Sequence, residues 1–458
     1  MTRLRALLLP LALILIGACQ VIPPDVAQQI VPTRTEYKTL EAAYHVLLER
    51  HVDVPTPGKL LVGALDGVDA YLQKSTDDKG AGCPAATVAR PTFTESPESD
   101  LVKASGALDG ALKDCPTADR TRIERAATDG MAKAMDECHT YYLDPDRAKD
   151  FNKPPQPYSG IGATILAASE TGGLAEISTV FPGSPAAKAG VHPGDRIKVV
   201  NGKDVTGFTP EEIANKIRGP EGTDVTLVLV RGTSELTFTI TRATLTPPRV
   251  TAQTFAEGKI AMVSVSALNG DVAQQTQDAV KAAIAAGAKG VILDLRNDPG
   301  GDLSAAVDIA SIFVSNATLV EQVGRDGKRE QVRTDDRFFI GFDGPVVVMV
   351  NTRSASGAEI IAAGLRSNGV ATVVGQRSAG CVGIAQPREM PDGGLLLVTL
   401  ARMEDASTGE PLNGKDRGVV PDVTAKDDPN TPDPEDVAAA VNVLEDKLAA
   451  KPGGVGTP

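Results

Sequence analysis

The stretch 345-PVVVMVN-351 is an apolar run that leads, after a short turn, into 356-SGAEIIAAGLRS-367, where apolar residues recur at helical spacing. A continuous Val-rich strand followed by a helix is typical of a sheet that helices cover on both faces. The same alternation of strand and helix occupies 259–266, 272–287, 290–296 and 302–314. The pattern predicts an α/β core with a mixed sheet, which we place at residues 247–425.

Two regions with other patterns precede this core. Apolar residues at helical spacing predict a helical region over residues 35–157, interrupted by a polar loop. Its helices are predicted at 36–53, 59–73 and 118–135. Residues 158–246 contain short β-type runs between Gly, Pro and Asp turns, which predict a compact β-rich domain with helices. An acidic, Pro-rich segment, a short helix and a tail follow at 426–458, so the predicted fold class is multidomain α/β.

The composition limits the possible partners. The chain of 458 residues has a formal net charge of −13 and no block rich in Lys or Arg. Binding to nucleic acid depends on clustered cations that neutralise phosphates, so nucleic acid is not an expected partner. Aromatic residues make up only 3% of the chain and Trp is absent, which disfavours platforms on which bases or sugars stack.

The N-terminus resembles a secretory signal peptide. Arg3 and Arg5 precede the apolar run 6-ALLLPLALILIGACQ-20, which is short for a membrane-spanning helix. The end of this run, 16-IGAC-19, resembles a bacterial lipobox, in which cleavage leaves a lipid-modified cysteine as the new first residue.

We therefore expect a signal peptide over residues 1–19, lipidation at Cys19 and a tether at 20–34. A protein of this kind would be extracytoplasmic and lipid-anchored to the membrane of a bacterial cell envelope. A signal peptide followed by an incidental cysteine is the alternative.

Four further cysteines suggest disulfides, because an even number of thiols outside the cytoplasm is usually paired. They are Cys83, Cys115, Cys138 and Cys381. Three pairings are possible, and the sequence alone does not choose among them. Cys83 and Cys115 bracket one polar segment, so their pairing is the simplest hypothesis, and it would leave Cys138 with Cys381. No group of His and Cys residues has the spacing of a metal site, so we predict no metal.

Two predicted strand ends carry unusual residues, and ligands of open α/β sheets bind beyond such ends. The turn Asp298–Gly301 contains two glycines, whose backbone N–H groups can point at a ligand without interference from side chains. Ser356 begins a helix, where free N–H groups stabilise negative charge. A serine there is often only a helix cap. Together, however, the two features suggest an oxyanion hole that faces a nucleophile.

Six motifs follow one another along the chain: 137-ECHTYYLDP-145, 160-GIGATI-165, 183-GSPAAKAGVHPGDRIKVVNGKDV-205, 292-ILDLRNDPGGDL-303, 354-SASGAEI-360 and 418-GVVPDV-423. In this order, over roughly residues 36–425, they resemble the carboxyl-terminal-processing, or tail-specific, serine proteases that carry a PDZ domain. The resemblance implies a PDZ domain at 158–246 and a serine protease core at 247–425. It also implies polypeptide substrates with exposed C-termini and no cofactor.

The resemblance assigns roles to individual residues. Ser356 would be the nucleophile, with oxyanion donors at Gly357 and at Gly300 or Gly301, and Ser354 would be structural. In the PDZ domain, the backbone of the loop Gly160–Ile161–Gly162 would bind the carboxylate of the substrate's C-terminus.

One position departs from the family pattern. The tail-specific proteases carry a lysine about 25 residues after the serine, and here Cys381 stands in its place. His139 is a candidate base, as in the lysine-lacking tricorn-type proteases, because an imidazole titrates near neutral pH. Glu410 could orient it. Cys381 could instead act as a thiolate or form a disulfide with Cys138, beside His139.

The sequence therefore predicts a serine endopeptidase that cleaves unfolded or C-terminally tagged proteins by a Ser/His mechanism. The alternative is a catalytically inactive homologue that binds peptides through its PDZ domain at the cell surface.

Overall fold

The computed structural model describes residues 35–76, 80–149, 151, 158–166, 173–181, 183–245, 248–414, 416–426 and 434–450. The expected lipidation site Cys19 and the expected tether at 20–34 lie outside the described residues. No helix in this described part combines the length and the apolar character that crossing a bilayer requires.

The N-terminal region is helical, as predicted, and contains one helix that the sequence analysis missed. Its helices are α1 (Lys38–Arg50), α2 (Pro57–Gln73), α3 (Pro97–Asp114) and α4 (Arg120–Lys133), followed by the short α5 (Pro145–Ala148). The missed helix, α3, begins at the end of the predicted loop and buries Leu101 and Leu108 against the other helices. A disulfide joins Cys83, before this helix, to Cys115 at its end.

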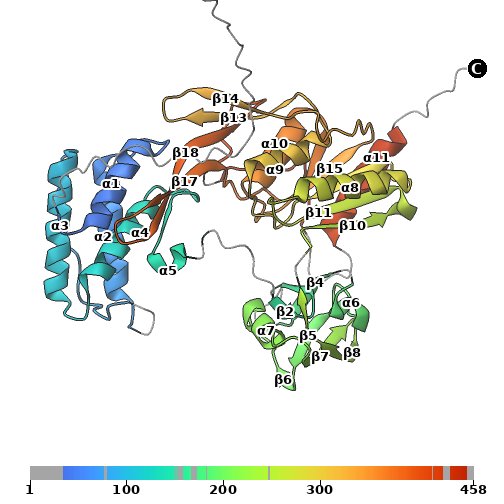
Figure 1. Cartoon of the computed structure of the whole chain (residues 1–458), viewed down its shortest axis with the longest axis horizontal. Helices are drawn as coiled ribbons and strands as arrows, with labels where there is room; N and C mark the ends of the chain where they lie inside the picture. The colour runs from blue at the N-terminus through green and yellow to red at the C-terminus, as the bar shows by residue number, and fades with distance from the viewer. Residues whose placement is uncertain are drawn as a thin grey trace, which may run out of the picture.

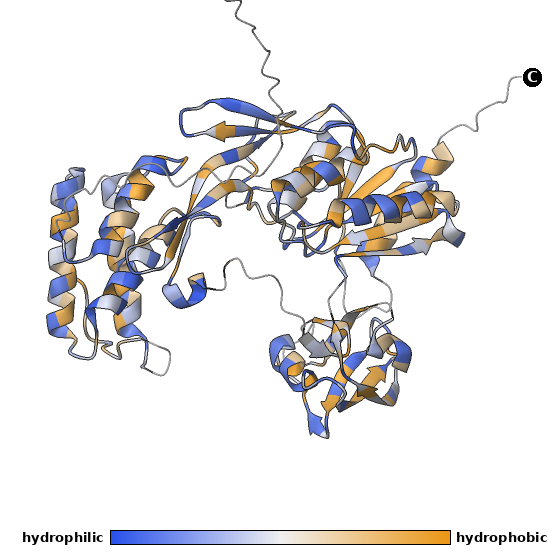
Figure 2. Ribbon diagram, viewed as in Figure 1, coloured by the Kyte–Doolittle hydropathy of each residue, from blue (hydrophilic) through white to orange (hydrophobic). Residues whose placement is uncertain are grey.

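The core is a six-stranded sheet in the order β10-β11-β12-β15-β16-β19, parallel except for β10 (Figure 1). Its strands are β10 (Val250–Phe255), β11 (Ile260–Val265), β12 (Gly290–Asp294), β15 (Val346–Val350), β16 (Ala371–Gly375) and β19 (Val423–Thr424); a 3-10 turn (Ala256–Gly258) follows β10. The central strands of this sheet are largely hydrophobic, whereas the outer side of the covering helices is largely hydrophilic (Figure 2). The predicted fold class is confirmed.

Helices cover both faces of this sheet. Successive side chains of each strand point to opposite faces, and both faces are apolar. One face packs against α8 (Val272–Ala285), α9 (Leu303–Ser311) and α10 (Gly357–Ser367), and the other against α11 (Glu435–Ala450). The sequence analysis placed only a short helix after the core. Helix α11 instead has 16 residues and buries Leu444 against the sheet, so it belongs to the core.

A buried ion cluster fixes α11 to the sheet. The guanidinium of Arg296 donates to both carboxylate oxygens of Asp294, at 2.8 and 2.9 Å, and to both oxygens of Asp436 on α11, at 2.8 Å. All three side chains are largely buried, so each charge depends on the others for compensation.

We expect Arg296→Met to lower the free energy of unfolding by about 3–5 kcal/mol, because it leaves two buried carboxylates without their cation. Urea unfolding followed by circular dichroism measures this loss. The control is Lys328→Met, which removes an exposed pair with Glu330 and should lower the free energy of unfolding far less, because solvent screens the pair. Equal losses for the two variants would contradict the prediction.

A second sheet, which the sequence analysis did not predict, joins the helical region to the core (Figure 1). Its strands are β1 (Tyr141–Leu143), β13 (Thr318–Gly324), β14 (Arg329–Arg333), β17 (Gly383–Glu389) and β18 (Leu395–Asp405). Strand β1 pairs with β18, and β17 pairs with the other edge of β18. This pairing brings the segment around His139 to the loop that contains Cys381.

The β-rich domain between these regions lies below the core in Figure 1. Its strands are β2 (Tyr158–Gly160), β3 (Ala163–Leu166), β4 (Ala175–Val180), β5 (Arg196–Val200), β6 (Lys203–Asp204), β7 (Asp224–Arg231), β8 (Ser234–Thr241) and β9 (Ala243–Leu245); its helices are α6 (Pro185–Ala189) and α7 (Pro210–Ile217). The main sheet has the order β3-β4-β5-β7-β8, which leaves β3 at an edge. Helix α7 contacts this edge strand.

Candidate active site

Ser356 lies at the junction of β15 and α10 in a strained backbone conformation. Its φ of 54° and ψ of −116° are unusual for a residue other than glycine. The Ser356 N–H donates to the carbonyl of Cys381, at 2.8 Å, and to Glu359 Oε2, at 3.0 Å. A strained strand-to-helix turn of this kind presents the nucleophilic serine in α/β-hydrolases. The Ser356 side chain is half-exposed.

Glu359 organises the loop around Ser356, a role that the sequence analysis missed. Its buried carboxylate accepts hydrogen bonds from the Ser378 hydroxyl (2.5 Å) and from the N–H groups of Gly380 (2.8 Å) and Cys381 (2.9 Å). Burial raises the pKa of Glu359, while these hydrogen bonds act in the opposite direction. The Ser-x-x-Glu spacing of residues 356–359 is the signature of a capping box and could have indicated this residue.

Ser354, the other serine of the motif, has a structural environment. Its hydroxyl donates to the carbonyl of Leu295 at 2.7 Å and accepts the N–H of Asn351 at 2.9 Å. Because the side chain is fully buried and both of these hydrogen bonds join backbone groups of the strand ends, Ser354 supports the turn on which Ser356 lies.

The glycine turn lies against the first residues of α10. A Cβ atom on Gly300 would lie 2.7 Å from both the Gly357 nitrogen and Ser356 Cβ, so only glycine fits there. The Gly300 N–H donates to Asp298 Oδ1 at 2.8 Å. Within the described ranges, the N–H groups of Gly301 and Gly357 donate no hydrogen bond. The geometry therefore favours Gly301, rather than Gly300, as the second oxyanion donor beside Gly357.

Asp298 is a buried acid within this turn. Burial raises the pKa of its carboxyl group to about 7 from 3.8, although the hydrogen bond from Gly300 opposes the shift. Its Oδ2 atom has no hydrogen-bond partner among the described residues. Its backbone carbonyl accepts the N–H of Ala355 at 2.9 Å, which joins the glycine turn to the serine turn. The protonation of Asp298 is therefore coupled to the stability of the site.

We expect Asp298→Asn to stabilise the protein at pH 8 more than at pH 5, by a difference of about 2 kcal/mol. A raised pKa means that the folded state binds the proton more tightly. The extra stability that protonated Asp298 gives the wild-type protein is fully present below pH 3.8 and is lost as the pH rises through about 7. Asparagine does not titrate, so the variant does not lose stability in this way. Urea unfolding of both proteins at the two pH values measures the difference. Parallel pH profiles would contradict the prediction.

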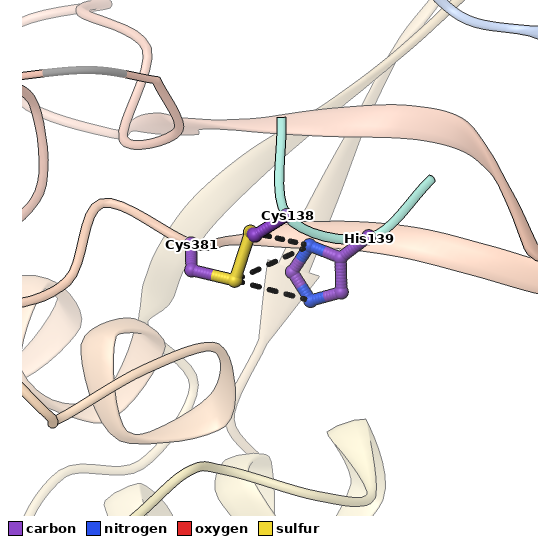
Figure 3. A group of neighbouring side chains, drawn as sticks. All are labelled: Cys138, His139 and Cys381. Atoms are coloured by element: carbon purple, nitrogen blue, oxygen red, sulfur yellow. Dashed lines mark hydrogen bonds between the residues drawn. A yellow bond between two sulfur atoms is a disulfide. The ribbon is translucent and has the colours of Figure 1, made fainter. Parts of the chain in front are cut away.

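His139 precedes β1 and lies against a disulfide between Cys138 and Cys381 (Figure 3). Its Nδ1 atom is 3.3 Å from the sulfur of Cys138 and 3.8 Å from that of Cys381, and its Nε2 atom is 3.9 Å from the latter. Burial lowers the pKa of His139, and the nearby Glu137 carboxylate opposes this shift. The imidazole is therefore neutral at neutral pH.

Cys381 contacts both Ser356 and His139, with its carbonyl group and its sulfur respectively. In the described part of the chain, however, no hydrogen bond joins the Ser356 hydroxyl to the imidazole, and no carboxylate accepts one from it. From His139, Glu137 accepts the backbone N–H, at 2.8 Å, and not the imidazole. Glu410, the carboxylate considered for orienting the ring, is exposed and pairs with Arg417 at 3.2 Å.

The loop Gly160–Ile161–Gly162 precedes the edge strand β3. The carbonyl of Ile161 accepts the N–H of Ala186 at 2.8 Å, and the carbonyl of Gly162 accepts the N–H of Phe181 at 2.9 Å. No described residue accepts a hydrogen bond from the N–H of Ile161 or Gly162. The carbonyls are thus bound within the domain, and two backbone donors remain available beside a strand edge that can pair with a peptide.

Two parts of the chain match known families. Residues 259–425 match peptidase family S41, and residues 176–231 match the PDZ domain. Among solved structures, the photosystem II D1 C-terminal processing protease has a similar fold, with a TM-score of 0.50 and 23% identity over 90% of this chain and 98% of that chain.

Two bacterial proteins have related sequences. The chain is 32% identical over 308 residues to a CtpA-like serine protease of Staphylococcus aureus (strain COL), which covers 67% of this chain and 60% of that protein. It is also 32% identical over 311 residues to the carboxy-terminal processing protease CtpA of Bacillus subtilis (strain 168), which covers 67% and 65%. The chain thus spans less than two thirds of the length of these relatives.

Proposed function

The chain belongs to the carboxyl-terminal processing proteases of peptidase family S41, which carry a PDZ domain, and on this premise we propose that it is an extracytoplasmic serine endopeptidase. It would cleave unfolded or C-terminally tagged polypeptides. The proposal rests above all on the strained Ser356, which lies beside the free N–H groups of Gly301 and Gly357. A protein that only binds peptides has no use for such an arrangement.

In the proposed reaction, Ser356 Oγ attacks the carbonyl carbon of the scissile bond while His139 accepts the hydroxyl proton. The N–H groups of Gly301 and Gly357 bind the oxyanion of the tetrahedral intermediate. His139 then protonates the leaving amine, and water hydrolyses the acyl-enzyme with the same base. Because no hydrogen bond yet joins Ser356 to His139, substrate binding must bring the imidazole to the hydroxyl.

Cys381 has no catalytic role in this proposal. Its sulfur is bonded to that of Cys138, so it has no thiolate to offer as a nucleophile or a base. No lysine occurs between Ser356 and Lys415. His139 contacts the sulfur of Cys381, whose carbonyl accepts the Ser356 N–H, so we assign His139 as the base.

The PDZ domain would select the substrate. A peptide can add to the open edge of β3, next to α7, and place its terminal carboxylate at the free N–H groups of Ile161 and Gly162. The two disulfides support an oxidising compartment, which agrees with export and lipidation at Cys19. We include the extracytoplasmic, lipid-anchored location in the proposal.

Cleavage of an unfolded polypeptide with an apolar C-terminal tail tests this function. We expect the wild-type protein to cleave it, and we expect amidation of the tail to raise KM by at least about 10-fold, because the neutral amide loses charge-assisted hydrogen bonds to the loop. Substrates with the free and the amidated tail differ in no other group. An unchanged KM would contradict the role of the PDZ domain.

Two matched variants separate the loop from general strain. Gly162→Ala should raise KM, because a Cβ at this positive φ would lie 2.4 Å from Ser184 Cβ. Gly202→Ala introduces the same kind of backbone strain at a φ of 76°, where no atom lies within 4 Å, and should not. Binding of the tail without any cleavage would instead support the alternative, an inactive homologue that uses its PDZ domain to bind peptides.

A further inference from the structure

Three metal-binding side chains meet at the disulfide beside the proposed base. Cys138 and His139 come from the segment before β1, and Cys381 comes from the loop between β16 and β17 (Figure 3). One ligand atom from each of the three residues lies within 4.8 Å of the others. Cys138 and Cys381 are 243 residues apart, so the group does not have the short spacing of a metal site, although the sequence analysis considered their disulfide beside His139.

The distances approach those that one zinc ion imposes. With Zn–S bonds of about 2.3 Å and a Zn–N bond of about 2.0–2.1 Å, tetrahedral geometry places sulfur and nitrogen ligands about 3.6 Å apart. His139 Nδ1 is already 3.3 Å from the sulfur of Cys138 and 3.8 Å from that of Cys381. Only the two sulfur atoms are too close, because they are bonded to each other. Reduction of this bond would let them separate to about 3.8 Å, the spacing of two thiolates on zinc.

The backbone that holds the three residues does not depend on the disulfide alone. Cys381 is fixed by its N–H to Glu359 Oε2 at 2.9 Å and by its carbonyl to the N–H of Ser356 at 2.8 Å. The backbone N–H of His139 donates to Glu137 Oε2 at 2.8 Å. Pairing of β1 with β18 holds the same segment. The ligands would therefore stay close together after reduction.

We propose that, when the disulfide is reduced, Cys138, His139 and Cys381 form a zinc site. A dithiol donates two electrons and two protons, is itself oxidised to a disulfide, and leaves Cys138 and Cys381 as thiols. Zn²⁺ then displaces the two thiol protons as two Zn–S bonds form, and the imidazole nitrogen supplies a third bond. Two thiolates and one imidazole favour zinc over calcium or magnesium, which prefer oxygen. A water molecule would complete the tetrahedron.

Zinc at this site would occupy the lone pair that His139 needs to accept a proton. The reduced, zinc-loaded protein would therefore be inactive, while the oxidised protein cannot bind the metal. This consequence for catalysis rests on the proposed role of His139, whereas the metal site itself does not.

Metal binding tests the site, and this readout does not depend on peptidase activity. The protein used is the full chain carrying Cys19→Ser and Ser356→Ala. Titration with Zn²⁺, and with Co²⁺ as a spectroscopic probe, is compared before and after reduction by a water-soluble phosphine, which is converted to its oxide as the S–S bond is hydrolysed. We expect one zinc per reduced chain, bound at least about 10²-fold more tightly than by the oxidised chain, and thiolate-to-cobalt charge-transfer absorption only after reduction.

The second disulfide supplies the matched control. Cys83→Ala with Cys115→Ala should retain the site, because no histidine of the described ranges forms a metal-binding group with that pair. Cys138→Ala with Cys381→Ala should abolish it. His139→Ala should weaken binding and keep the thiolate absorption. If the reduced chain binds no more metal than the oxidised chain, or if the protein without Cys138 and Cys381 keeps the absorption, the site does not exist. If the reduced chain binds metal but the oxidised, metal-free protein with Ser356 intact shows no peptidase activity, only the proposed function is refuted.

Discussion

Replacing Ser356 with alanine is expected to reduce kcat/KM for cleavage of a tailed, unfolded polypeptide by at least about 10³-fold, because no other group in the site can form the acyl-enzyme. The variant should keep its fold, since Ser356 holds the loop through its backbone N–H, which alanine retains. Binding of the tail to the PDZ domain should be unchanged. Parallel measurements of cleavage and of tail binding on the same preparations provide the readout.

The matched control is Ser354→Ala. This change removes a hydroxyl that joins Leu295 to Asn351, so it should destabilise the turn and lower activity only in proportion to the loss of folded protein. If Ser356→Ala retained cleavage, or if Ser354→Ala abolished it in a fully folded protein, the nucleophile would have been misassigned.

Most of the core could be predicted because its central strands and the helices between them show local patterns. Short, Val-rich apolar runs such as 346–350 indicate buried strands, and the segments between them show helical spacing. Both the mixed sheet and the position of Ser356 at a strand end follow from this pattern. The glycine turn was found for a similar reason, because paired glycines after a buried strand indicate a backbone that a ligand approaches.

The second sheet could not be predicted, since its pairings join distant segments. Strand β1 has three residues and pairs with β18, which lies more than 240 residues later in the chain. Such a strand has no detectable periodicity of its own, and tertiary contacts decide its structure. The same long-range pairing brings His139 to Cys381. The sequence therefore could not decide whether the candidate base contacts the serine loop.

The choice between Gly300 and Gly301 also required coordinates. Both residues are glycines of one turn, and only the hydrogen bond from the Gly300 N–H to Asp298 distinguishes them. Likewise, Glu359 falls on a predicted helix, where a glutamate is normally exposed. Its burial is compensated by hydrogen bonds from the Ser378 hydroxyl and from the N–H groups of Gly380 and Cys381, a loop that lies about 20 residues further along the chain.

His139→Ala is expected to lower kcat by about 10²–10⁴-fold, the usual contribution of a general base, with a smaller effect on KM. Because Ser356 and His139 would act as a unit, the double variant should be no less active than Ser356→Ala alone. Steady-state kinetics on the tailed polypeptide measures each parameter. A kcat within about 3-fold of the wild-type value would show that the base lies elsewhere.

A lysine placed at residue 381 gives this prediction a positive test. The carbonyl of Cys381 accepts the Ser356 N–H, so a long side chain at this position starts close enough to reach the serine hydroxyl. In the His139→Ala protein, the further changes Cys138→Ser and Cys381→Lys should restore at least about 10-fold in kcat, since an amine near Ser356 replaces the missing base. Cys138→Ser with Cys381→Ser, which also removes the disulfide but supplies no base, should restore none.

Equal activity of the two combinations would mean that residue 381 does not face the nucleophile. Rescue by Cys381→Lys but not by Cys381→Ser would show that a base at residue 381 can replace His139 at the nucleophile.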